Sequence, residues 1–211
     1  MPALPRLDAD EFSRDPLALA DALRDRGACV IEDRPDARLR AALRAELLAL
    51  QADGALVRAA IGRDAGRALR EDIRADATRW LDDPRCGAPA RAFRDELEAI
   101  RALLNRSLFL GLSGVEAHYA AYPPGGGYAR HRDRFRDSDA RVVSWVSYLN
   151  DDWGPDDGGA LRLYLDDGHV DVTPVACSVC FLSELEHEVL PARRDRYSIA
   201  SWFRRDRDLL R

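Results

Sequence analysis

The sequence predicts a mainly β protein with supporting α-helices, whose strands form an antiparallel sandwich or barrel. After residue 112, eight short strand-like runs alternate with turn sequences such as "PPGGG" and "DDWGPDDGG". So many short strands in about 90 residues are typical of such architectures. Before that point, apolar residues recur at helical spacing. We therefore expect a single domain over residues 1–211, with mainly helical support in 1–111 and the β-barrel core in 112–205.

Two amphipathic helices are expected near the start of the chain. In "SRDPLALADALRDRG", Asp15 is a candidate N-cap, Pro16 suits the first helical position and Gly27 ends the helix. "ACVIED" (28–33) then predicts a short strand. The second helix runs through "DARLRAALRAELLALQADG", where leucines recur every three or four residues. We expect both helices to cover one face of a sheet.

The middle of the chain contains a weakly patterned segment and a third helix. Residues 55–72 have glycines among arginines and no strong period, which predicts a loop or hairpin. A third helix follows Pro89 in "PARAFRDELEAIRALLNRSL". The eight strands are then expected in "VEAHYAAYP", "YARHRD", "VVSWVSYLN", "ALRLYL", "HVDVTPV", "SVCFLS", "HEVLP" and "RYSIASWF".

The four cysteines do not predict a metal site. Cys177 and Cys180 form a CxxC pair, but "VACSVCFL" is an apolar run typical of a buried strand. Residues three apart on a strand point to opposite faces, so these thiols cannot easily share a metal. We expect them, with Cys29 and Cys86, to be structural thiols.

Composition and charge exclude several classes of protein. With 46% hydrophobic and 33% charged residues, the chain is expected to fold as a globular protein. No apolar run approaches the roughly 18 residues of a membrane span, and "MPALPRLDADEF" lacks the basic and apolar regions of a signal peptide. The net charge of −5 argues against a nucleic-acid partner. We expect a cytoplasmic protein with no membrane partner.

One set of residues suggests a metal centre. On a strand, His131 and Asp133 project from the same face, and His187 can supply a third ligand from a facing strand. Two histidines and one carboxylate leave coordination positions open, as in non-heme Fe(II) oxygenases. Nine residues after His187 comes Arg196, which shares a strand face with residues 198, 200 and 202. An arginine inside a barrel needs an anionic partner, which a dicarboxylate co-substrate would provide.

The segments "YPPGGGYARHRD", "SYLNDDWGPDDGGALRLY" and "HEVLPARRDRYSIASWF" resemble the 2-oxoglutarate- and Fe(II)-dependent prolyl hydroxylases of the hypoxia-inducible-factor type and their bacterial relatives. With "DIRADATRWL", the resemblance covers about residues 15–205. It implies a double-stranded β-helix (jelly-roll, cupin-like) fold. The implied ligands of iron are His131, Asp133 and His187. Arg196 would clamp the far carboxylate of 2-oxoglutarate, and Tyr148 and Tyr122 would hydrogen-bond to it.

The resemblance also implies the reaction and its partners. The enzyme would use O2 and 2-oxoglutarate to hydroxylate a prolyl residue in a protein, releasing succinate and CO2, with ascorbate as reductant. In bacterial relatives the protein substrate is elongation factor Tu, which is the specific hypothesis here. The loop at 55–72 would act as a lid over the peptide. The implied substrate mouth consists of Asp76, Trp80, Tyr128, Arg141, Leu161 and Trp202.

Three other hypotheses remain open. The same chemistry could act on a free amino acid or small metabolite, which needs a closed pocket instead of a groove. A non-catalytic cupin-like metal-binding module needs no clamp such as Arg196. A nucleic-acid demethylase usually carries a second arginine after the clamp, where this strand has Ser198, Ala200 and Trp202.

Two further histidines have weaker assignments. His118 shares a strand face with Ala120 and Tyr122, which favours either a lining role in the pocket or a hydrogen-bonded core histidine. His169, in the expected turn "LDDGHV", is predicted to be exposed and without a function.

Overall fold

The computed structural model describes residues 3–59, 73–134 and 140–205. Helices α2 (Pro16–Arg26) and α3 (Ala37–Ala52) are capped by Asp15 and Asp36, whose carboxylates accept backbone N–H bonds. Helix α4 spans Ala88–Leu108. These three helices confirm the predicted ones. A short helix, α1 (Ala9–Arg14), was not predicted.

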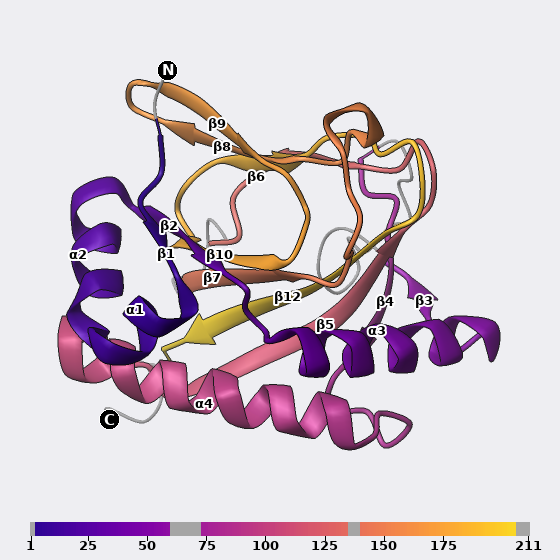
Figure 1. Cartoon of the computed structure of the whole chain (residues 1–211), viewed down its shortest axis with the longest axis horizontal. Coiled ribbons are helices and arrows are strands. Elements are labelled where there is room, and N and C mark those ends of the chain that lie inside the picture. The colour runs from indigo at the N-terminus through magenta and orange to yellow at the C-terminus, as the bar shows by residue number, and fades with distance from the viewer. Residues whose placement is uncertain (1–2, 60–72, 135–139, 206–211) are drawn as a thin grey trace.

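The strands form two sheets that face each other (Figure 1). The eight-stranded major sheet has the order β1-β2-β10-β7-β12-β5-β4-β3, and the four-stranded minor sheet has the order β6-β11-β8-β9. The major-sheet strands are β1 (Arg6–Leu7), β2 (Ala28–Glu32), β3 (Val57–Arg58), β4 (Ala77–Trp80), β5 (Gly114–Tyr122), β7 (Arg141–Tyr148), β10 (Cys177–Leu182) and β12 (Arg196–Arg204). The minor-sheet strands are β6 (Tyr128–His131), β8 (Leu161–Leu165), β9 (Gly168–Val172) and β11 (His187–Val189), and a 3-10 turn lies at Pro155–Asp157.

The helices and the minor sheet lie on opposite sides of the major sheet (Figure 1). One apolar cluster joins the helices to the major sheet, and a second fills the space between the sheets. On β10, Cys180 belongs to the first cluster and Cys177 to the second, so the two thiols do face opposite sides. All four cysteines are free and buried. The predicted packing of helices on one face of a sheet is confirmed.

The register of β5 and β12 brings the polar inner residues of both strands together. Tyr122 pairs with Arg196, and His118 pairs with Ala200. Because side chains alternate along a strand, the residues at 118 and 122 point into the space between the sheets, as predicted. Tyr119, between them, belongs instead to the cluster under the helices.

Three local predictions need revision. "ATRW" forms strand β4, which was not predicted, because its pairing with β5 is a long-range contact. The predicted loop or hairpin begins with β3 paired to β4, and residues 60–72 lie outside the described residues. His169 is exposed as predicted and lies in strand β9, in agreement with the expected strand "HVDVTPV"; the turn predicted in "LDDGHV" ends before it. Among the helices of the described residues, none is long and apolar enough to cross a membrane.

Candidate active site

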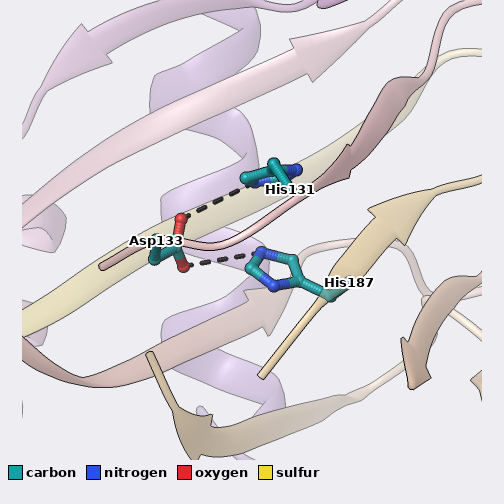
Figure 2. Close-up of side chains that lie close together, drawn as sticks. All are labelled: His131, Asp133 and His187. Carbon is teal, nitrogen blue, oxygen red and sulfur yellow. Dashed lines mark ion pairs between the residues drawn. The ribbon is translucent and has the colours of Figure 1, made fainter. Parts of the chain in front are cut away.

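Three side chains converge between the sheets at the ends of two minor-sheet strands (Figure 2). His131 ends β6, His187 begins β11, and the two residues are paired across the strands. The Nε2 atoms of His131 and His187 lie 3.7 and 3.5 Å from the carboxylate oxygens of Asp133. One ligand atom from each residue falls within 4.8 Å of the others. Two nitrogens and one oxygen thus face a common point.

Backbone carbonyls orient both imidazoles. His131 Nδ1 lies 2.8 Å from the carbonyl oxygen of Ala129, and His187 Nδ1 lies 3.0 Å from that of Leu185. A carbonyl oxygen can only accept, so each Nδ1 carries a proton and each Nε2 is the nitrogen that faces the centre. This arrangement, in which the outer nitrogen donates to a carbonyl, is typical of histidines that bind metals.

The carboxylate of Asp133 is ionised and held in place. Burial opposes its ionisation, but the adjacent His187 and His131 hold the pKa of Asp133 below its usual range. Its Oδ2 accepts a 2.7 Å bond from Ser144 Oγ, which also contacts Ser183 Oγ. Burial lowers the pKa of His187, although Asp133 opposes this. A carboxylate with a neutral imidazole is the protonation state that binds a divalent metal.

Asp133 was predicted to lie on the same strand as His131, but the structure places it after the strand has ended. Strand β6 ends at His131, and Asp133 lies just beyond it, where the next residue's backbone N–H bonds to the carbonyl of Ser183. The chain therefore leaves the minor sheet and turns toward the major sheet. The carboxylate reaches the centre through this turn and not through strand alternation.

A second polar group lies in the same inter-sheet space. Arg196 is 1% exposed, and its Nε and Nη1 donate to Gly159 O (2.9 Å) and Ser198 Oγ (3.2 Å). Its Nη2 and the hydroxyl of Tyr148 are buried and have no hydrogen-bond partner among the described residues. The guanidinium carbon lies 5.1 and 5.2 Å from the ring centres of Tyr122 and Tyr148. A buried cation with one donor nitrogen still unbonded, beside a buried hydroxyl without a partner among the described residues, fits an anionic ligand that the protein does not itself supply.

The six residues predicted for the substrate mouth occupy different depths. Trp80 is 45% exposed, whereas Trp202 is buried beneath the guanidinium of Arg141, which lies 3.6 Å from its ring centre. Tyr128 stacks on the ring of His131 at 3.6 Å. Asp76 is buried, and Leu161 lies within the apolar cluster between the sheets.

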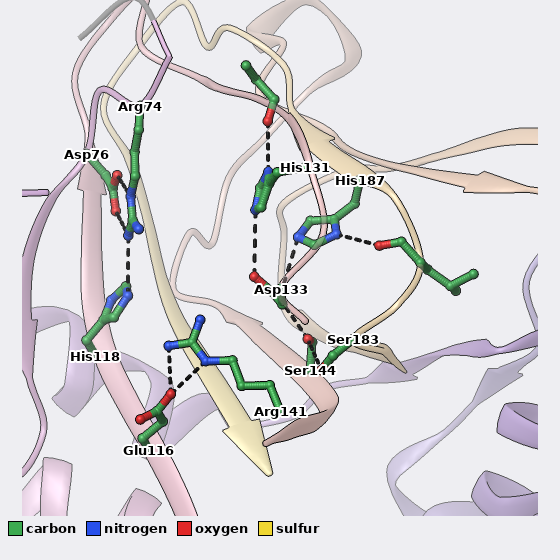
Figure 3. A network of polar contacts seen from close by, with 12 residues as sticks. Arg74, Asp76, Glu116, His118, His131, Asp133, Arg141, Ser144, Ser183 and His187 are labelled. Atoms are coloured by element: carbon green, nitrogen blue, oxygen red, sulfur yellow. Dashed lines mark hydrogen bonds and ion pairs between the residues drawn. The ribbon is translucent and has the colours of Figure 1, made fainter. Parts of the chain in front are cut away.

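Several residues of this site were missed in the sequence. Ser144 contacts Asp133, Glu116 pairs with Arg141, and Arg74 pairs with Asp76 (Figure 3). Strand alternation could have found the serine, because it precedes Tyr148 by four residues on the same strand. Arg74 and Asp76 are two residues apart in "DIRADATRWL", so their pairing could also have been found, whereas Glu116 and Arg141 meet only through the fold.

Comparisons with known proteins agree with this geometry. The family model described as the 2OG-Fe(II) oxygenase superfamily matches residues 117–204. A crystal structure of a Pseudomonas putida prolyl-4-hydroxylase is 44% identical, with a TM-score of 0.81 over 90% of this chain and 99% of that chain. A Trichoplax adhaerens prolyl hydroxylase, in complex with a hypoxia inducible factor oxygen degradation domain peptide fragment, is 28% identical, with a TM-score of 0.77 over 88% of this chain and 87% of that one. The predicted double-stranded β-helix is confirmed.

Sequence similarity extends to curated relatives that are longer. Egl nine homolog 1 from Rattus norvegicus is 31% identical over 143 residues, which are 63% of this chain and 42% of that protein. The human protein of the same name matches equally over 33% of its length. The chain therefore spans less than half the length of these relatives.

Proposed function

The chain belongs to the 2-oxoglutarate- and Fe(II)-dependent prolyl hydroxylase family, and on that premise we propose that it hydroxylates a prolyl residue of a protein, with succinate and CO2 as co-products. One observation carries the proposal beyond family membership. The two unpartnered groups, Arg196 Nη2 and Tyr148 OH, suit a dicarboxylate beside a metal centre of two histidines and an aspartate. A binding module that only stored a metal would have no use for a buried, unpaired guanidinium.

Each polar group of the site has a proposed role. His131, Asp133 and His187 would hold Fe(II). Arg196 would bind the far carboxylate of 2-oxoglutarate, assisted by the hydroxyls of Tyr148 and Tyr122. When bound, iron, 2-oxoglutarate and O2 together supply the oxidising power, and ascorbate is the proposed reductant that keeps iron in its Fe(II) state.

The protein's own task is to place the target carbon and exclude water. Trp202 and Leu161 give the mouth an apolar lining, and Tyr128 covers the ring of His131. Arg141 and Asp76 are each already paired with an opposite charge. Such a wall favours an uncharged side chain such as proline, because a charged one would lose its hydration without gaining a partner.

The proposed protein substrate is elongation factor Tu, and the proposed location is the cytoplasm, where that factor works. The choice of elongation factor Tu rests on the sequence resemblance to bacterial enzymes of this type, and the 44% identity with the Pseudomonas putida prolyl-4-hydroxylase supports a prolyl target.

Mass spectrometry tests the proposal. Purified elongation factor Tu and host lysate would be incubated with the protein, Fe(II), 2-oxoglutarate and ascorbate. His131→Ala removes a ligand, and His169→Ala is a matched control at an exposed histidine. We expect a mass gain of one oxygen on a proline with wild type and with His169→Ala, and none with His131→Ala.

The negative outcomes are distinct. Succinate formation that His131→Ala abolishes, with no modified protein, would move the substrate to a free amino acid or small metabolite. No 2-oxoglutarate conversion under any condition would reject the enzymatic proposal.

A further inference from the structure

His118 stands on the wall of the site opposite the metal centre (Figure 3). It lies on β5, is 4% exposed, and is not one of the three converging metal ligands. Its Nδ1 lies 3.0 Å from the carbonyl oxygen of Tyr119, and its Nε2 lies 3.4 Å from Arg74 Nη2. Both ring nitrogens of this buried histidine are therefore occupied by the protein.

The two contacts determine the protonation state of the ring. The carbonyl of Tyr119 can only accept, so Nδ1 carries a proton. The guanidinium of Arg74 can only donate, so Nε2 must be a bare acceptor. His118 is thus a neutral imidazole in the Nδ1–H form. Burial, followed by the charge of Arg74, lowers its pKa to about 4, which agrees with this state.

Arg74, which His118 contacts, itself contacts two residues of the predicted substrate mouth. Arg74 Nε and Nη2 bond to the two oxygens of Asp76 at 2.6 and 2.9 Å. The guanidinium carbon also lies 4.9 Å from the ring centre of Tyr128, which stacks on His131. His118 on β5, Tyr128 on β6 and Asp76, just before β4, therefore all contact the guanidinium. Together they restrict its position.

The ring of His118 also contacts the two tryptophans of the mouth. Trp80 and Trp202 each lie 5.2 Å from it, centre to centre, with interplanar angles of 85° and 55°. The indoles lie 6.5 Å from each other. The three ring centres thus form a triangle, in which the imidazole packs against one side of both indoles and supports the apolar surface that a substrate would meet.

We propose that His118 is a positioning residue for substrate binding, which holds Arg74 against Asp76 and Tyr128 and supports Trp80 and Trp202 by packing against both rings. The inference rests on the proposed function, because it assigns a task within the same mouth. It predicts an effect on protein-substrate binding and not on metal or 2-oxoglutarate binding, since His118 contacts none of the groups assigned to those ligands.

The first test needs no substrate. The sequence has four histidines, so long-range ¹H–¹⁵N spectra of the labelled protein at pH 7 can resolve each ring. We expect His118, assigned by its loss in His118→Gln, to show a protonated Nδ1 and a bare Nε2. The Arg74→Met variant should shift that Nε2 signal and leave His169 unchanged. A charged ring, a protonated Nε2, or no shift in Arg74→Met would overturn the inference.

The second test separates positioning from general stability. His118→Met fills the space without an acceptor, His118→Gln returns an acceptor near Nε2, and His169→Gln is the matched surface control. With elongation factor Tu as substrate, we expect His118→Met to raise its KM about tenfold, which equals about 1.4 kcal/mol. The kcat and the KM for 2-oxoglutarate should stay within about twofold, because an interaction outside the chemical step affects binding alone.

The outcomes distinguish the two proposals. His118→Gln should recover most of the KM, because it restores the acceptor for Arg74. A fall in kcat and 2-oxoglutarate binding together with KM, or no rescue by glutamine, would show a merely structural histidine. If wild type leaves elongation factor Tu unmodified, the proposed substrate is wrong, while the ring spectra still decide whether His118 holds Arg74.

Discussion

Replacing Arg196 by methionine should have opposite consequences for the free protein and for its complex with 2-oxoglutarate. The guanidinium is 1% exposed and makes two hydrogen bonds, and its Nη2 has no partner in the described part of the chain. Methionine has a similar length and no charge to desolvate. Replacing a buried, incompletely paired ion by an apolar side chain is often neutral or stabilising. We therefore expect the free energy of unfolding of the ligand-free variant to stay within about 2 kcal/mol of wild type.

The ligand complex should respond strongly. Removing one partner of a buried charge pair costs about 2–5 kcal/mol, which weakens binding by about 30-fold to several thousand-fold. At a 2-oxoglutarate concentration of about 100 times the wild-type Kd, wild type gains about 2.7 kcal/mol. For a domain of this size that raises Tm by about 5–11 °C. At the same concentration the variant should gain under about 1 kcal/mol, or less than about 4 °C.

The assay is thermal unfolding with and without 2-oxoglutarate, in the presence of Mn(II) as a stable substitute for Fe(II). Arg193→Met is the control, because Arg193 is exposed and lies only three residues away. It should keep the wild-type ligand shift. A full ligand shift in Arg196→Met would refute the clamp assignment, and a loss of more than about 4 kcal/mol without ligand would show that the arginine is structural.

The remaining predictions concern the metal, the backbone and pH. Ser144→Ala should weaken Mn(II) binding about tenfold in calorimetric titration, because it removes a 2.7 Å bond to Asp133. Gly159→Ala should lower Tm more than Gly54→Ala: both glycines have positive φ, but only at Gly159 would a Cβ meet other side chains, at 3.0–3.2 Å. Between pH 6.5 and pH 4, the free energy of unfolding in urea should fall as the pH falls. Burial lowers the pKa of His118 to about 4, so in this range the histidine of the unfolded chain binds a proton that the folded protein does not. In His118→Gln this contribution, which amounts to roughly 3 kcal/mol of unfolding free energy over that pH range, should be absent.

Each of these predictions has a contrary outcome. Ser201→Ala is the serine control, because its buried hydroxyl has no partner among the described residues; equal metal affinities in both serine variants would contradict a supporting role for Ser144. Equal Tm losses for the two glycine variants would mean that crowding at Gly159 is unimportant. An unchanged pH slope in His118→Gln would assign the acid sensitivity to other groups.

The sequence predicted those features that depend on local chemistry. The candidate cap Asp15 located the start of one helix, and leucine spacing located the helix that begins after Asp36. Alternation along the strand placed His118 on the same face as Tyr122. The ligand set itself came from residue types and order, since His131 and His187 bear the same chemistry whatever their exact backbone.

Features made by distant segments could not be predicted in this way. Ser144 meets Ser183 across 39 residues, and Arg74 meets His118 across 44. Nothing in either local sequence marks these pairs, because their partners are set by how the strands are ordered in the major sheet. Asp133 was predicted as part of the ligand set, but its backbone was wrongly predicted to be a strand. A turn and a strand can both present a carboxylate two residues after a histidine.

Three histidines of the inter-sheet site show how the same local contact gives different results. In each of His118, His131 and His187 a backbone carbonyl accepts a hydrogen bond from Nδ1–H, so Nε2 is the nitrogen that meets another partner. For the two minor-sheet histidines, Nε2 faces the carboxylate of Asp133 at the proposed metal centre. For His118 it faces the guanidinium of Arg74, so the cation is part of the protein. The fold thus orients the proposed metal ligands through their own backbone carbonyls, and it uses the same kind of contact to orient His118 on the opposite wall.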